Sequence, residues 1–184
     1  MNYAHLHLML NHIPVILFPA GVLLLAYGMI AKDDRLKRLS FVVFVLVALA
    51  TIPVYLTGGE AEEVVEDLPG IVEHNIEEHE EASTQAFIAA EIAGAFCLVA
   101  LIAYRRRPLP GWTVGTGFVL SLIVAGLMAY TSNLGGHIRH PETSPGWRPP
   151  ASESIEKSHE SDRSEIADLS DTNHLISIAH LRHM

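Results

Sequence analysis

Cysteine is nearly absent from this 184-residue chain, which contains Cys97 and no other. A single cysteine excludes an internal disulfide framework, a zinc ribbon and the Cys-x-x-Cys-His attachment site of c-type haem. The chain also lacks a His-Glu-x-x-His zinc motif and a glycine-rich phosphate-binding loop. The formal net charge of −9 argues against nucleic acid as a partner.

Apolar residues, in contrast, are abundant and lie in four long runs. They make up 49% of the sequence, and the mean hydropathy is +0.28. Each run has the roughly 20 residues that a helix needs to cross a bilayer core of ~30 Å. Within lipid the backbone must satisfy its own hydrogen bonds, which favours helices. We therefore predict an all-α integral membrane four-helix bundle, with helices at about residues 13–31, 39–57, 70–107 (including an extension beyond the membrane) and 112–136.

The chain divides into two parts by composition. Residues 1–143 hold the four apolar runs and form the predicted transmembrane domain. Residues 144–184 are rich in Ser, Pro and charged residues, and this composition predicts a disordered tail.

Basic residues predict the orientation in the membrane. They gather after the first apolar run, between Lys32 and Arg38, and after the third, at residues 105–107, whereas residues 58–84 contain acidic residues but no Lys or Arg. By the positive-inside rule the basic loops are cytoplasmic, so both termini and residues 58–84 lie outside. We predict a multi-pass protein of the bacterial inner membrane with periplasmic termini, whose acidic outer segment is able to dock a basic redox carrier.

All seven histidines that precede the tail fall at the predicted outer end of the bundle. Helices of bundles commonly present metal and haem ligands to one another, so this gathering favours a cofactor site. The seven are His5, His7, His12, His74, His79, His137 and His140.

His12 and His79 are the two candidates with the most support. His12 lies two residues before Pro14, which suits the first turn of a helix. It is predicted to be an inward ligand, with an interfacial cap as the alternative. His7 lies five residues earlier, about 140° round a helix, so both serve one site only if the helix begins between them. His79 continues a stripe of alanines that starts at Ala82, although such stripes also occur in ordinary helix packing.

The third cluster follows a pair of glycines. Gly135 and Gly136 either break the fourth helix or let a ring approach its backbone closely. His140 is the favoured inward residue of this cluster, and His137 is the second choice.

Imidazole ligands without sulfur suit haem iron, copper or zinc. Histidines on separate helices beside a small-residue seam favour a noncovalent haem b, which takes an axial ligand on each face. We expect two of the three residues His12, His79 and His140 to ligate one haem iron and the third to serve a second haem or a propionate, with His137 and His7 as further candidates. A copper- or zinc-handling protein using the same histidines, and a cofactor-free structural subunit, are the alternatives.

Glu91 is an acidic residue inside an apolar run. A carboxylate within the membrane is costly when charged, so it suggests a function. The sequence leaves two roles open: Glu91 relays a proton, or it stays protonated and bonds a neighbouring helix.

Several of these segments together resemble a known family. His7 and His12 followed by Pro14 resemble the opening of a bacterial family of four-helix membrane proteins catalogued as a domain of unknown function, and Gly135, Gly136 and His140 resemble its closing segment. The segment YLTGG at residues 55–59 and His79 also fit, so the resemblance covers about residues 5–141. This family is similar in layout to small b-type cytochromes, which implies haem binding by His12, His79 and His140.

The sequence shows no nucleophile and no paired catalytic acids, which favours an electron-transfer component over a stand-alone enzyme. We expect it to relay electrons between the quinone pool, or a partner membrane subunit, and an extracytoplasmic redox protein.

Overall fold

The computed structural model describes residues 3–65, 73–140 and 143. It divides into one unit from Met1 to Pro141, which holds all the described helices, and a second from Glu142 to Met184. The predicted tail and the middle of the acidic segment lie outside the described residues.

In the described residues, the prediction of an all-α four-helix protein is confirmed. All four helices are long and apolar enough to span a membrane. They are α1 (Tyr3–Ile30), α2 (Asp34–Val65), α3 (Glu73–Ala103) and α4 (Gly111–Arg139).

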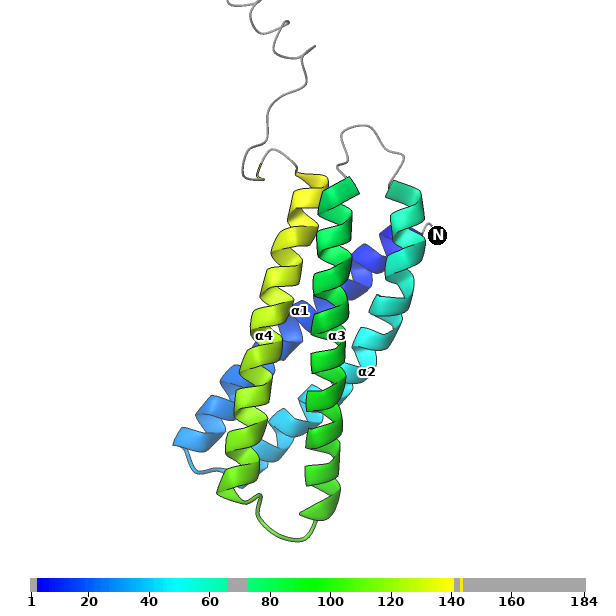
Figure 1. Ribbon diagram of the computed structural model, residues 1–184. Coiled ribbons are helices and arrows are strands. Elements are labelled where there is room, and N and C mark those ends of the chain that lie inside the picture. Colours follow the sequence, from blue (N-terminus) through cyan, green and yellow to red (C-terminus); the bar gives the residue numbers. More distant parts are fainter. Residues whose placement is uncertain (1–2, 66–72, 141–142, 144–184) are drawn as a thin grey trace, which may run out of the picture. The chain divides into compact units, whose positions relative to one another are not determined.

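The helices form two hairpins, α1–α2 and α3–α4. The N-terminal ends of α1 and α3 lie at the same end of the bundle as the C-terminal ends of α2 and α4 (Figure 1). Each helix packs against its neighbours in the chain, and α1 also packs against α4. In these helices, no Cα atom of α1 comes within 8 Å of a Cα atom of α3. These two helices therefore face each other across the bundle.

Three helices extend further than the apolar runs indicate. α1 begins ten residues earlier than expected, at Tyr3, and α2 continues through Gly58 to Val65. α4 continues past Gly135 and Gly136 to Arg139. The apolar runs mark the thickness of hydrocarbon, whereas backbone hydrogen bonds carry a helix beyond it. A glycine costs a helix about 1 kcal/mol relative to alanine, which is too little to end it here.

The exterior of the bundle is apolar. Leu23 is 72% exposed, Leu46 60% and Ile92 57%, although all three lie near the middle of their helices. Water would disfavour such a surface, whereas lipid accommodates it. Inside, the rings of Phe18, Phe41 and Phe44 are fully buried.

Arg38 connects α2 to the turn after α3, at the end of the bundle opposite the histidines. Its guanidinium donates to the carbonyl oxygen of Tyr104 at 2.8 Å and also to that of Arg107, and it pairs with the Asp34 carboxylate at 3.0 Å. The other carboxylate oxygen of Asp34 accepts a bond from the Leu109 amide at 3.2 Å. The turn between α3 and α4 is thereby tied to α2.

Candidate functional site

His7 on α1 lies against the backbone of α2. Its ring is half-buried, and Nδ1 lies 3.0 Å from the carbonyl oxygen of Val54 and 3.3 Å from Oγ1 of Thr57. A Cβ atom at Gly58 would lie 3.7 Å from Cε1 of the ring. This is an ordinary contact distance, so a methyl group at this position would also fit beside the ring.

His79 on α3 lies against α4 in the same way. Its ring is also half-buried, and Nδ1 lies 3.0 Å from the carbonyl oxygen of Thr131. A Cβ atom at Gly135 would lie only 3.1 Å from Cε1 of the ring. A larger residue at this position would have to displace the imidazole.

The two hairpins thus repeat one arrangement. In each, the first helix supplies a histidine, and the second supplies a carbonyl oxygen four residues before a glycine. Each glycine is the first of a Gly-Gly pair whose second member, Gly59 or Gly136, would meet nothing within 4 Å if it had a Cβ atom.

The hydrogen bonds define which ring nitrogen is available for a ligand. A carbonyl oxygen only accepts, so Nδ1 of His7 and of His79 carries the proton and donates. A neutral ring in this tautomer presents the lone pair of Nε2. Metal-binding histidines are typically oriented in this way, with the other ring nitrogen bonded to a carbonyl or carboxylate.

Both imidazoles lie in the first turns of their helices and therefore at the same end of the bundle, although α1 and α3 are opposite each other in it. Beside them, Oγ1 of Thr131 is buried, and among the described groups it has no hydrogen-bond partner. Two fixed imidazoles, two adjacent glycines and an unpaired hydroxyl suit a flat group that takes one ligand from each hairpin.

His12 points in a direction opposite to the predicted one. Its side chain is exposed, and Nδ1 lies 2.6 Å from the carbonyl oxygen of Leu8 in its own helix. The helix begins at Tyr3, before both histidines, so their five-residue spacing places them on different faces. His7 is therefore the inward residue of the pair and His12 the outward one.

Three of the remaining four histidines are exposed. His137 is half-buried and its carbonyl oxygen accepts a bond from Asn75 at 3.2 Å, whereas His140 is exposed at the C-terminal cap of α4. His5 is exposed, and so is His74, whose Nε2 lies 3.4 Å from Glu78. The structure does not bring His12, His79 and His140 together: among the residues it describes, no three His, Cys, Asp or Glu side chains could hold one metal ion.

Glu91 lies near the middle of α3, where this helix crosses α2. Its Oε1 is 3.0 Å from Oγ1 of Thr51. One turn further along α3, a Cβ atom built on Gly94 would clash with the Cβ of Ala48. The carboxyl group therefore meets α2 next to a point where the two helices touch closely.

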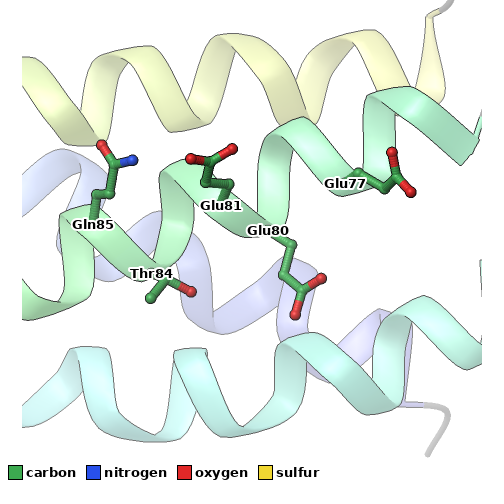
Figure 2. A pocket seen from close by; sticks show the side chains of 5 residues that line it. All are labelled: Glu77, Glu80, Glu81, Thr84 and Gln85. Carbon is green, nitrogen blue, oxygen red and sulfur yellow. The ribbon is translucent and has the colours of Figure 1, made fainter.

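An acidic hollow lies on the surface of α3 near the histidine end. Figure 2 shows its five lining residues, with Glu80 and Thr84 directed toward α2 and Glu81 and Gln85 toward α4. Glu77 completes the lining. We refer to these residues as the acidic hollow.

Sequence reasoning missed the parts of the site that the backbone supplies. Carbonyl oxygens such as those of Val54 and Thr131 carry no signal in the residue type. The sequence analysis used the Gly-Gly pair at 135–136 as a signal for the close approach of a ring, but not the matching pair at 58–59 near the end of α2.

Residues 4–140 match a family model described as "Predicted membrane protein (DUF2231)". The match includes all four helices and both inward histidines, and leaves out the C-terminal segment. Neither a curated protein nor a solved structure gives a significant match to the chain.

Proposed function

We propose that this chain, which belongs to the DUF2231 family of predicted membrane proteins, binds one b-type haem between His7 and His79 and transfers single electrons. One observation carries the proposal. The two imidazoles come from opposite helices, and a backbone carbonyl fixes each with Nε2 available as a ligand. His7 replaces His12 and His140 of the sequence prediction as the partner of His79.

The number of side chains at the site favours haem over copper or zinc. The porphyrin supplies four of the six ligands of haem iron, so two histidines complete the set. A protein site for zinc generally uses three or four side chains. Among the described residues no group of three could hold a metal ion, whereas the pair needed for haem is present.

Haem, when bound, supplies a one-electron couple at its iron. The residues of this chain position and tune it. The carbonyl oxygens of Val54 and Thr131 orient the imidazoles and make Nε2 more basic. Gly58 and Gly135 leave room beside each ring, and the hydroxyl of Thr131 is a polar group within the site.

The orientation and the partners follow from charge. With Arg38 and Arg105–Arg107 on the cytoplasmic side of a bacterial inner membrane, the histidine end faces the periplasm. Electrons would pass between the quinone pool, or a partner membrane subunit, and an extracytoplasmic redox protein. The acidic hollow and the neighbouring glutamates favour a basic carrier.

The test is a reduced-minus-oxidised absorption spectrum of the purified protein, produced with ample haem. We expect the Soret shift and α-band of a low-spin b-type haem, and their loss in His7→Ala and in His79→Ala. His12→Ala is the matched control, because it removes an exposed imidazole from the same helix.

Two results would overturn the proposal. One is a wild-type protein without a haem spectrum, and stoichiometric copper or zinc in that protein would establish the alternative. The other is retention of the spectrum in both His7→Ala and His79→Ala.

A further inference from the structure

Glu91 is an ionisable group that the proposed haem site does not use. It is separated from His79 by twelve residues, about 18 Å along α3. Between Ala82 and Tyr104 no other residue of the sequence is acidic or basic. None of the ion pairs found in the described residues includes Glu91, so no cation there compensates a negative charge.

The distances around Thr51 indicate which oxygen atom accepts the hydrogen of its hydroxyl group. Oγ1 of Thr51 lies 2.6 Å from the carbonyl oxygen of Ala48 and 3.0 Å from Oε1 of Glu91. The hydroxyl has one hydrogen, and the carbonyl of Ala48 has none to donate. At 2.6 Å the hydrogen of Thr51 must point to Ala48, because two bare oxygens would repel each other at that distance.

The contact between Thr51 and Glu91 then needs a second hydrogen. Once Thr51 donates to Ala48, its oxygen is left with lone pairs facing Oε1 of Glu91 at 3.0 Å. An ionised carboxylate would place two acceptors opposite each other. A carboxylic acid has the missing hydrogen and completes a chain from Glu91 to Thr51 to Ala48.

We infer that Glu91 is protonated in the folded protein and donates to Thr51, so that the two residues form a proton-binding site within the membrane-spanning part of the bundle. The bond is made between α2 and α3, beside the close contact of Gly94 with Ala48. A neutral acid at this depth avoids the cost of a bare charge in hydrocarbon. The inference does not depend on haem, because neither Thr51 nor Glu91 touches the histidine pair.

The proton is detected by infrared spectroscopy of the purified protein in lipid at neutral pH. We expect a C=O stretching band of a carboxylic acid in the wild-type protein and its loss in Glu91→Gln. Thr51→Val keeps the shape of the side chain but removes the hydroxyl. It should leave the band present and shift its frequency, because the acid loses its hydrogen-bond acceptor.

An apolar carbodiimide gives an independent measurement, because it reacts with protonated carboxyl groups in apolar surroundings. We expect one adduct, located by mass spectrometry on Glu91, and none in Glu91→Gln. Glu81→Gln is the matched control, because it removes an exposed carboxylate of the same helix and should leave the adduct unchanged. Protection of the buried Cys97 thiol from a maleimide verifies that each variant is folded.

The inference fails if the folded wild-type protein shows no acid band that Glu91→Gln removes. It also fails if Thr51→Val leaves the frequency of the acid band unchanged, because Glu91 then does not donate to Thr51.

Discussion

At the scale of single residues, the site depends on glycine as much as on histidine. An imidazole reaches a main-chain carbonyl of a neighbouring helix only where a side chain does not block it. Gly135 provides that access to His79, whereas its chain neighbour Gly136 faces open space. The two members of this Gly-Gly pair therefore have different roles, which substitution can separate.

We expect Gly135→Ala to weaken haem binding by about tenfold or more, the effect typical of disturbing a group that orients a ligand. The new Cβ would lie 3.1 Å from Cε1 of His79, so the ring must move away from the carbonyl of Thr131. Haem titration followed by absorbance measures the change. Gly136→Ala is the control and should bind as the wild type does; equal affinities in both variants would contradict the role of Gly135.

The sequence predicts the inward position of a histidine only when the helix register is known. His79 belongs to a stripe of alanines, and Ala82 and Ala86 are indeed buried below it. The local signal for His12 was Pro14, which suggested that the first turn of the helix lies there. In the structure Pro14 lies inside α1. The apolar run does not reveal where a membrane helix begins outside the lipid, so the choice between His7 and His12 could not be made correctly from the sequence.

At the scale of helices, close packing in the middle of the bundle depends on small residues. The alanine stripe of α3 is buried, and Gly94 lies directly against Ala48 of α2. Phe41 similarly covers Gly117 of α4, where a Cβ would lie 2.6 Å from its Cζ atom. These contacts determine how closely α2 approaches α3 and α4.

We expect Gly94→Ala to destabilise the bundle by about 1–3 kcal/mol, the usual cost of overpacking a core. The added methyl group would clash with Ala48, so α2 and α3 must separate. Thermal unfolding in detergent, followed by the reaction of the buried Cys97 with a thiol-reactive dye, measures the loss. Gly126→Ala adds a methyl group where nothing lies within 4 Å, and it should unfold at or above the wild-type temperature, because alanine favours a helix more than glycine does. The packing argument is wrong if both variants unfold alike.

Arg38 should matter to stability more than any neighbouring basic residue. Arg38→Gln removes charged hydrogen bonds to the last carbonyls after α3, and we expect a loss of about 2 kcal/mol. The same Cys97 assay measures it. Arg35 is exposed on the same end of α2, so Arg35→Gln is the control. An equal effect of the two substitutions would show that charge, and not these bonds, is responsible.

Helix number and location were predictable because apolar length is a strong signal, but the ends were not. The predicted helix at 39–57 falls inside α2, and the one at 13–31 falls inside α1 except for its last residue; both observed helices are longer. The observed helices continue for whole turns through polar residues and glycines, because continuous backbone hydrogen bonding outweighs the low helix propensity of single residues. Those extra turns contain His7 and Gly58, so the part of the site that sequence reasoning missed lies where the helix ends were underestimated.

At the scale of the whole molecule, the positive-inside rule predicts that the acidic hollow and the basic turn at residues 105–107 lie on opposite sides of the membrane. Introducing one cysteine at a time into a Cys97→Ala background tests this directly. We expect Glu80→Cys to react with a membrane-impermeant maleimide in intact cells, and Arg106→Cys to react only after lysis, because both positions are exposed. The reverse pattern would invert the topology and the proposed direction of electron transfer.

Charge at the histidine end leads to a second prediction for the whole molecule. If a basic carrier docks there, the rate of its electron exchange with the reduced protein should fall as the salt concentration rises. Salt screens the attraction between the acidic surface and the basic carrier. Stopped-flow mixing with a cationic and an anionic redox protein measures this. Glu77→Gln combined with Glu81→Gln should slow the cationic carrier and leave the anionic one no slower. Independence from salt would argue against this docking surface.

The division of the inward histidines between the two hairpins couples ligand binding to assembly. A group held by His7 and His79 together binds only when the α1–α2 and α3–α4 hairpins are docked. By mass action, such a ligand stabilises the docked state by about 2.7 kcal/mol at a hundred times its dissociation constant. Cells short of the ligand would then hold a looser bundle that is more open to membrane proteases. The abundance of the protein would follow the supply of the group it binds.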